Sequence, residues 1–482
     1  MKDKLEKALD AVSETYIAEA AMPKKHRRRP LWIGSAAAAL AAAVLALCLW
    51  PAAPGGKTTD QSPTNAAVAD LGDYRLAKPE YPGLHPYPLD TYQTEGYDEW
   101  WEQQRELHNQ PDGYADSLQP YFAGLVSQIT AQTEGENVAC SPVNVYMALA
   151  MLAETTAGSS RDQLLELLGA DSIEQLRTQA GHVWRGHYND DGLSTSILGS
   201  SLWLEEGYPV NEKTANLLAE HYYASVFRGD LGSEAMNSAL QSWLNEQTGG
   251  LLEEQVNNVT LPPRSVLALA TTVNYKVQWI DWFSEDKNTE GIFHSPQGDQ
   301  EVTFMNTELS YGPYYWGEHF GAVSLSLEDN SQMWLFLPDE GFSPEQIVPE
   351  AMSFLEEDPY EYENKKSLRV QLSVPKFDIV SQMDLVDTLK ELGVTEVFQP
   401  GTADFSPIIT VADGGCVDEV NHAARVAIDE QGVTAAAFTV IIRCGAGMPS
   451  ADEIDFILDR PFFFVIESQD GLPLFTGVVN TP

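Results

Sequence analysis

Residues 417–439, VDEVNHAARVAIDEQGVTAAAFT, join a strand-like run to a series of small side chains. The run ARVAIDEQG has the composition of a β-strand and ends at a glycine, a residue that commonly marks a turn. Gly432 can adopt backbone dihedrals that are closed to other residues, so the chain can change direction there. Small side chains occupy the next positions, Val433, Thr434, Ala435, Ala436 and Ala437. The stretch therefore predicts a strand, a hinge and a segment that fits into narrow spaces.

The chain around this stretch, from residue 114 to the C-terminus, mixes helical and strand-like patterns. Residues 454–468 and 472–480 predict a β-hairpin that is buried on both faces. Helical patterns gather early and strands gather late, so we expect an α+β fold rather than alternating βαβ units. Helical spacing of apolar residues occurs in segments 117–129, 143–154, 236–249 and 383–393, and strand-like runs occur in 265–279, 332–340 and 368–379.

Residues 31–50, LWIGSAAAALAAAVLALCLW, form an uncharged apolar run. As a helix it would be about 30 Å long, the thickness of a bilayer's hydrocarbon core. A cluster of cations in residues 24–29 precedes it, so the positive-inside rule predicts a cytoplasmic segment 1–30 and a single-pass anchor in the cell membrane. Residues 51–113 then form an extracellular spacer with one helix at YDEWWEQQRELH, and residues 114–482 form an extracellular domain.

Two other interpretations of the apolar run are less consistent with its sequence. A cleaved signal peptide would have a shorter apolar region and a shorter basic segment before it. A lipoprotein attached through Cys48 would need a small residue before the cysteine, and Leu47 stands there.

Composition excludes several classes of function. The net charge of −43 argues against a nucleic-acid partner, because phosphate binding needs positive charge. No GxSxG, HExxH or GxxxxGK[ST] motif occurs, so the sequence predicts neither an enzyme nor a cofactor. His182 and His187 are too loosely spaced for a metal site. The cysteines outside the span form no CxxC pair and predict no disulfide framework: Cys140, Cys416 and Cys444.

Six segments resemble the serpin family of serine protease inhibitors, of a membrane-anchored, bacterial type. They occur in the family's order and cover nearly all of residues 114–482: NVACSPVNVYMALAML (137–152), SWLNEQTGGLL (242–252), LSVPKFDIVSQMDLVDTLKELGVTEVF (372–398), GTADFSPI (401–408), residues 417–439 and FILDRPFFFVI (456–466). The resemblance implies a large mixed β-sheet with smaller sheets, about eight or nine helices around them, and an exposed reactive loop.

The resemblance also implies an irreversible suicide-substrate mechanism against serine, or alternatively cysteine, endopeptidases. The protease attacks a bait bond and forms an acyl-enzyme, and the cleaved loop then inserts into the central sheet and disables the protease. The hinge for insertion would comprise Glu430, Gly432 and the small residues that follow. If Val433 points inward, alternation points Ala435 and Ala437 inward as well and places Phe438 on the outer face.

The family's spacing between hinge glutamate and scissile bond places the bait at Ala446–Gly447. These small residues suit elastase-like or subtilisin-like targets with shallow pockets. Because the stretch before Pro461 is somewhat longer than in typical relatives, Arg443 and Met448 remain alternatives. Cys444 would lie in the exposed loop as an unpaired thiol.

By resemblance, Ser141 and His422 belong to a polar network, the shutter, that holds two central strands together. Asn144 and Thr271 replace the serine and asparagine that the family commonly has there, so the network is altered. Trp279 matches the tryptophan at the point where the loop enters. The protein is expected to act as a monomer.

The alternative function is a non-inhibitory serpin that serves as a cell-surface binding or structural module. Such relatives commonly carry charged, bulky or proline residues in the hinge. Ala435–Ala437 favour inhibition, whereas Val433 and Phe438 depart from the inhibitory pattern.

Overall fold

The computed structural model describes most of the chain from residue 71 onward, namely residues 71–88, 96–133, 135–250, 256, 259–261, 265–280, 283–357, 361–409, 415–417, 420–433 and 452–482. The expected cytoplasmic segment 1–30, membrane span 31–50 and bait residues 434–451 lie outside the described residues. Within the described ranges, no helix is both long and apolar enough to cross a membrane.

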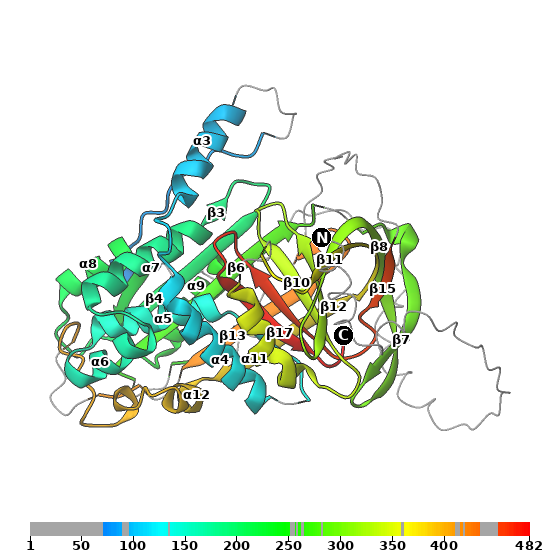
Figure 1. The fold of residues 1–482 in the computed structure, drawn as a ribbon. Helices are drawn as coiled ribbons and strands as arrows, with labels where there is room; N and C mark the ends of the chain where they lie inside the picture. The colour runs from blue at the N-terminus through cyan, green and yellow to red at the C-terminus, as the bar shows by residue number, and fades with distance from the viewer. Residues whose placement is uncertain are drawn as a thin grey trace, which may run out of the picture. The chain divides into compact units, whose positions relative to one another are not determined.

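Two β-sheets form the framework of the unit that contains the described residues (Figure 1). The first sheet has the order β1-β5-β4-β6-β14-β13-β12, and β3 pairs with β4 outside this path. Its strands are β1 (Arg75–Ala77), β3 (Asn189–Asp190), β4 (Thr195–Glu205), β5 (Ala224–Gly229), β6 (Leu267–Gln278), β12 (Phe377–Asp384), β13 (Asn421–Ile428) and β14 (Gly432–Val433).

The second sheet has the order β15-β11-β8-β9-β10-β16-β17-β2, and β7 pairs with β8 outside this path. Its last two long strands, β16 and β17, form the expected antiparallel hairpin, and almost every residue in them is buried. The strands are β2 (Val138–Cys140), β7 (Thr289–Ser295), β8 (Gly298–Trp316), β9 (Phe320–Ser326), β10 (Gln332–Pro338), β11 (Lys365–Pro375), β15 (Glu453–Ile457), β16 (Phe462–Glu467) and β17 (Pro473–Val479).

Side chains that cap helices mark where several of them begin. Ser141, Ser172, Asn211 and Ser233 each accept a hydrogen bond from a backbone N–H two or three residues later. The described α-helices are α3 (Tyr97–His108), α4 (Gln119–Gln132), α5 (Pro142–Thr155), α6 (Gly158–Leu167), α7 (Ile173–His187), α8 (Glu212–His221), α9 (Glu234–Gln247), α11 (Pro344–Leu355) and α12 (Val386–Glu391). Their number and the two mixed sheets confirm the expected α+β class.

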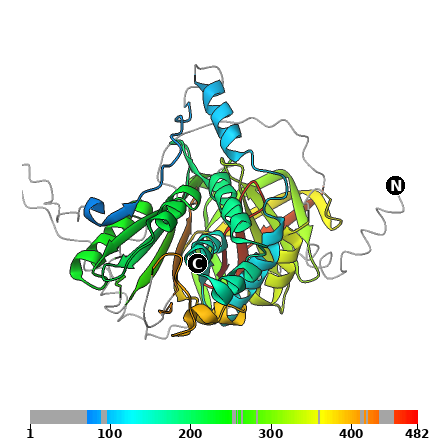
Figure 2. The same cartoon turned by 90° about the vertical axis from the view of Figure 1, so that its left-hand side faces the viewer.

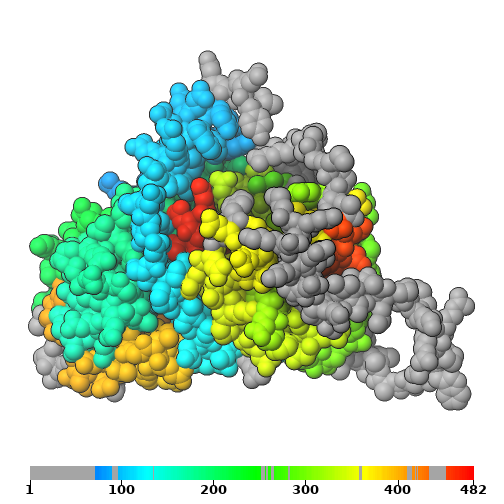
Figure 3. Space-filling model, in the orientation of Figure 1, coloured from blue at the N-terminus to red at the C-terminus, as the bar shows by residue number. Residues whose placement is uncertain are grey.

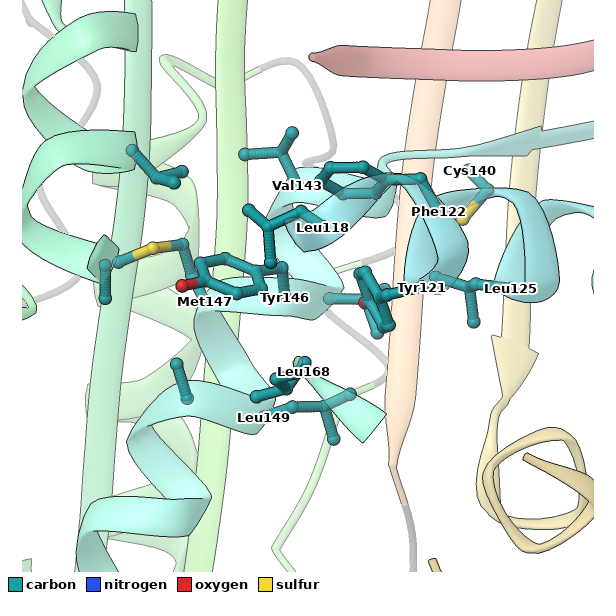
Figure 4. Packing of buried hydrophobic residues seen from close by; sticks show 14 of the residues in the cluster. Leu118, Tyr121, Phe122, Leu125, Cys140, Val143, Tyr146, Met147, Leu149 and Leu168 are labelled. Carbon is teal, nitrogen blue, oxygen red and sulfur yellow. The ribbon is translucent and has the colours of Figure 1, made fainter. Parts of the chain in front are cut away.

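The hydrophobic core lies around α5, in which every residue except Ala148 is buried. This helix contacts β4 and β6 of the first sheet and β17 of the second sheet. Figure 2 shows the cyan helices of this region beside the green and orange strands of the first sheet. Figure 4 shows how Val143 and Tyr146 of α5 pack with Leu118 and Phe122, all of which are inaccessible to solvent.

Residues 71–118, hereafter the N-terminal extension, pack on the same framework. The sequence suggests a spacer here because it is rich in proline, glycine and polar residues. In the structure, β1 adds a strand to the edge of the first sheet, where Ala77 pairs with Val226 of β5. Further along, the ring of Tyr81 lies 5.1 Å from Trp184 and 5.7 Å from Tyr188. Aromatic contacts and edge pairing therefore order this segment, although its polar composition gives no indication of either.

Candidate functional site at the centre of the first sheet

The boundary between β6 and β13, hereafter the seam, is the unusual feature of the first sheet. The two strands run parallel, and β14 pairs antiparallel with each of them at one end. Gly432 and Val433 are the only two residues of β14. Beyond β14, no ladder pairing joins β6 to β13 among the described residues. Within the described part of the chain, backbone pairing therefore holds the seam together at one end only.

A tight turn places β14 in the seam. The Asp429 carboxylate accepts hydrogen bonds from the backbone N–H groups of Gln431 (2.8 Å) and Gly432 (3.2 Å). Trp279, which is 1% exposed, donates from its backbone N–H to the Gln431 carbonyl and from its indole N–H to the Asp429 carbonyl, both at 2.9 Å. Trp279 thus joins the end of β6 to the turn that precedes β14.

Gly432 is needed here for a reason that differs from the one expected. Its φ does not lie in the left-handed region, so unusual dihedrals are not what this position requires. A Cβ on Gly432 would instead lie 2.1 Å from the Val277 carbonyl oxygen and 2.7 Å from the Gln278 Cα. Close approach to the backbone of β6 therefore excludes any side chain at this position.

Val433 points into the core. It is 1% exposed, pairs with Val277 of β6 and Ile428 of β13, and belongs to the hydrophobic cluster between the sheets. The expected alternation required Val433 to point inward, and the structure shows this orientation for Val433. The remaining hinge and bait residues lie outside the described residues: Thr434, Ala435, Ala436, Ala437, Arg443, Cys444, Ala446, Gly447 and Met448.

Glu430 is held by two neighbours that the sequence did not single out. Its carboxylate forms an ion pair with the Lys376 ammonium group at 2.5 Å and accepts a hydrogen bond from the Asn288 side chain. Partial burial acts to raise the pKa of Glu430, but the hydrogen bonds from Lys376 and Asn288 lower it overall. Lys376 lies inside the quoted segment LSVPKF, whereas Asn288 follows a short 3-10 turn and carries no recognisable signal.

The structure brings Ser141, Asn144 and His422 together below the seam. His422 is 4% exposed, and its Nε2 accepts a hydrogen bond from the Ser141 backbone N–H at 3.1 Å. Burial lowers the pKa of His422 to about 4, so the imidazole is uncharged at neutral pH. The Ser141 hydroxyl accepts from the Asn144 backbone N–H, which caps α5. The hydrogen bond from Ser141 to His422 links the start of α5 to β13.

The altered positions of this network are also visible. Both polar atoms of the Asn144 side chain are buried and have no hydrogen-bond partner among the described residues. Thr271 lies on β6 opposite Ser200 of β4, and no hydrogen bond within the described part of the chain joins it to His422. Ser381 of β12 was not anticipated, and its hydroxyl accepts a hydrogen bond from the backbone of Ala139 at 2.8 Å.

His182 and His187 do not converge on a common site. The Nδ1 atom of His182 lies 2.6 Å from the Gln110 side-chain oxygen, and that of His187 lies 2.6 Å from the Val183 carbonyl. Among the residues that the structure describes, no group of three or more histidine, cysteine or acidic side chains could hold a metal ion. Cys140 is a free, buried thiol, and burial raises its pKa far above the ordinary value.

Comparison with known proteins identifies a family model and related sequences that match this chain. The family model of serpins (serine protease inhibitors) matches residues 121–482. Serpin-ZX of Arabidopsis thaliana is 26% identical over 73% of this chain and 94% of its own length. A serpin-like protein of Thermococcus kodakarensis is 26% identical over 86% of this chain and 95% of its own length.

Solved structures show the same fold. The native state of the thermophilic serpin tengpin covers 83% of this chain and 98% of its own, with a TM-score of 0.67 and 24% identity. The latent state of the same protein has a TM-score of 0.64. Serpins are as a family inhibitors of proteases and are not themselves enzymes, which agrees with the absence of the hydrolase motifs sought in the sequence. The chain belongs to the serpin family.

Proposed function

We propose that this protein is an irreversible suicide-substrate inhibitor of serine endopeptidases. The target protease cleaves the bait bond and becomes covalently attached as an acyl-enzyme. The freed segment after Val433 then enters the seam as an additional strand and carries the attached protease with it. The inhibitor itself performs no catalysis and is consumed in the reaction.

The state of the seam is the observation that supports this proposal most directly. Two residues, Gly432 and Val433, already stand between β6 and β13 as the first pair of an antiparallel strand. Insertion therefore extends an existing ladder and needs no new nucleus. Most residues in the first two thirds of β6 are only half-buried, whereas Tyr275, Val277 and Gln278 beside or near β14 are buried. That difference is expected of a strand with one side not yet covered.

The register of β14 sets how much chain the seam can receive. Gly432 pairs with Gln278 and Val433 with Val277. Continued along β6, this register sets Thr434 opposite Lys276 and Arg443 opposite Leu267, the first residue of β6. β6 has 12 residues and β14 uses two of them, so 12 − 2 = 10 positions remain.

The same register bears on the bait bond. Residues as far as Arg443 would pair with β6 in the sheet. A protease attached at Arg443 itself would therefore contact the end of β6. A bond at Ala446–Gly447 leaves three residues between the last paired position and the attached protease. We therefore prefer Ala446–Gly447 over the alternatives Arg443 and Met448, and targets of the elastase or subtilisin type with shallow pockets.

Insertion would release enough free energy to deform an attached protease. About ten further ladder hydrogen bonds contribute roughly 5–15 kcal/mol at about 0.5–1.5 kcal/mol each. Burying the inward side chains Ala435, Ala437, Thr439 and Ile441 adds roughly 3–6 kcal/mol. The sum is comparable to the free energy of unfolding of an ordinary domain, about 5–15 kcal/mol.

We further propose that residues 31–50 anchor the inhibitor in the membrane with the serpin domain outside. The chain enters the described unit at Leu71, and Arg75 of β1 pairs with Phe227 of β5. Through β4, that level of the sheet corresponds to Ala268 of β6, nine residues from Val277. At about 3.3 Å per residue, the level at which β1 joins the sheet lies about 30 Å from the end that carries the hinge turn. The uncharged apolar run and the cations before it support the anchor.

A denaturing gel tests the inhibitory function. The full-length chain is incubated with pancreatic elastase, subtilisin or trypsin, and we expect a covalent complex that survives SDS with at least one of the first two. Such a band with trypsin alone would move the bait bond to Arg443. Clean cleavage of the loop without any covalent band would instead support the non-inhibitory alternative, a cell-surface binding module. N-terminal sequencing of the released C-terminal fragment identifies the scissile bond.

A further inference from the structure

Three elements meet where the N-terminal extension crosses the body of the protein. α3 ends at His108, α7 ends at His187, and the turn between β16 and β17 presents Asp470. The Tyr114 hydroxyl, which follows α3, donates a hydrogen bond to the Asp470 carboxylate at 3.0 Å. In Figure 3 the red residues of the C-terminal hairpin lie directly beside the light-blue chain of the extension. We call this meeting point the α3 junction.

His187 is enclosed in the α3 junction in an uncharged form. It is 4% exposed, and its Nδ1 lies 2.6 Å from the Val183 carbonyl oxygen. A carbonyl only accepts hydrogen bonds, so Nδ1 carries the ring proton. Its Nε2 is buried and has no hydrogen-bond partner among the described residues. A second proton on this ring would create a buried N–H donor with no acceptor, which is costly.

His108 repeats the same arrangement from the side of α3. Its Nε2 is likewise buried and unpartnered within the described part of the chain. Burial lowers the pKa of His108, and a hydrogen bond to the Gly186 backbone opposes that effect only in part. Burial also lowers the pKa of His187, and the proximity of His108 lowers it further. Two imidazoles thus face one junction, and the proximity of His108 disfavours the protonated form of His187.

The charged groups around the pair do not reverse this preference. Asp470 favours the protonated form of both rings, and Asp191 favours that of His108, but burial outweighs them. Asp191 is already engaged, because its carboxylate accepts hydrogen bonds from Leu193, Ser194 and the Trp100 indole. On the remaining side, the half-buried His182 contacts Gln110, and Arg185 bonds the Gly181 carbonyl within α7.

We propose that the α3 junction is an acid-sensitive contact between α3 and α7. α3 stays docked on α7 while His108 and His187 are uncharged, and α3 is released when these histidines are protonated. A released histidine binds protons with its ordinary pKa of about 6.5, and the docked one binds them less readily. The released state therefore holds more protons below that pH, and acidification favours release. From pH 7.5 to 5.0 the largest shift in the docking equilibrium is about thirtyfold for each histidine.

Hydrogen–deuterium exchange on the full-length chain tests the proposal, with labelling times corrected for the intrinsic effect of pH. Between pH 7.5 and 5.0 we expect the protection of the α3 amides, residues 97–108, to fall at least tenfold. Amides of the core helix α5, residues 142–155, should keep their protection. A loss below twofold in α3, or an equal loss in α5, would overturn the proposal, because the first shows no release and the second shows global unfolding.

Two substitutions separate the histidines from other acid effects. His108→Asn and His187→Asn each keep an N–H donor in the position of Nδ1 but cannot gain a proton. In the double variant we expect the protection of α3 to change less than twofold between the two pH values. The control is the His294→Asn variant. His294 is an exposed histidine of β7 that is paired with Asp299, and the variant should respond to pH as the wild type does.

An unaltered pH response in the double variant, or a response abolished equally by the control, would overturn the assignment to the α3 junction. If the double variant does not fold, the single variants carry the test. Each is then expected to reduce the pH effect on α3 by several fold relative to the wild type, and an unchanged effect in both would contradict the proposal.

Discussion

Replacing Gly432 with alanine should convert the inhibitor largely into a substrate. The added Cβ would lie 2.1 Å from the Val277 carbonyl oxygen, so β14 must leave the backbone of β6. Val433 then loses its burial, which contributes about 1.5–3 kcal/mol, and the paired positions lose ladder hydrogen bonds of about 0.5–1.5 kcal/mol each. If about 2 kcal/mol of this loss falls on the barrier to insertion, the insertion rate decreases about thirtyfold.

The assay is the stoichiometry of inhibition, the number of inhibitor molecules consumed for each protease molecule trapped. Slower insertion gives the acyl-enzyme time to hydrolyse, so the stoichiometry should rise on the order of tenfold while the rate of loop cleavage stays the same. Gly207→Ala is the matched control, since its Cβ would meet no atom closer than 3.8 Å. An unchanged stoichiometry in Gly432→Ala would refute the view that insertion extends from β14.

Three further substitutions address neighbouring contacts. Glu430→Gln should lower the free energy of urea unfolding by about 1–2 kcal/mol at pH 7, discounted because Lys376 is partly exposed. The pKa of Glu430 is lowered in the folded state, so this difference should persist above pH 4.5 and disappear as the pH falls through the folded-state pKa. A difference that stays constant at every acidic pH at which the protein remains folded would contradict the ion pair. His422→Leu leaves the buried Ser141 N–H without its acceptor and should cost about 1–3 kcal/mol at pH 8. The cost should be smaller at pH 6, because the pKa of His422 is about 4 in the folded state and only the unfolded wild-type chain gains a proton there. A stability at pH 8 within about 0.5 kcal/mol of wild type, as for ordinary surface substitutions, would exclude a structural role. Ala435→Arg should place a charged side chain on the inward face and give cleaved inhibitor without the SDS-stable band, and a band of normal intensity would count against insertion of that residue.

Much of the fold could be predicted because its strongest signals are local. The periodicity of 143–154 and the paired apolar runs after residue 454 correspond to α5 and to the β16–β17 hairpin. Packing on both faces makes these segments continuously apolar, and such segments are recognisable without knowledge of the fold. The extension was harder, since β1 has three residues and its pairing with β5 depends on a partner about 150 positions away.

Some residues of the candidate site could be predicted from the sequence, and others could not. Ser141, His422 and Trp279 were identified through motifs, and the structure places each beside β13 or the hinge turn. The contact of Glu430 with Asn288 could not be foreseen, because it joins residues 142 positions apart without any pattern in either segment. Close packing against β6 explains Gly432, and packing distances cannot be derived from the residue type alone.

Amide exchange in the loop-cleaved protein would examine the central claim most directly. After cleavage by a target or model protease, residues 434–442 should become as protected as β6 and β13, and the thermal midpoint should rise because the sheet has gained a strand. If these residues continue to exchange at the rate of an unfolded peptide and the midpoint stays where it was, the seam does not take up the loop, and the inhibitory mechanism is wrong.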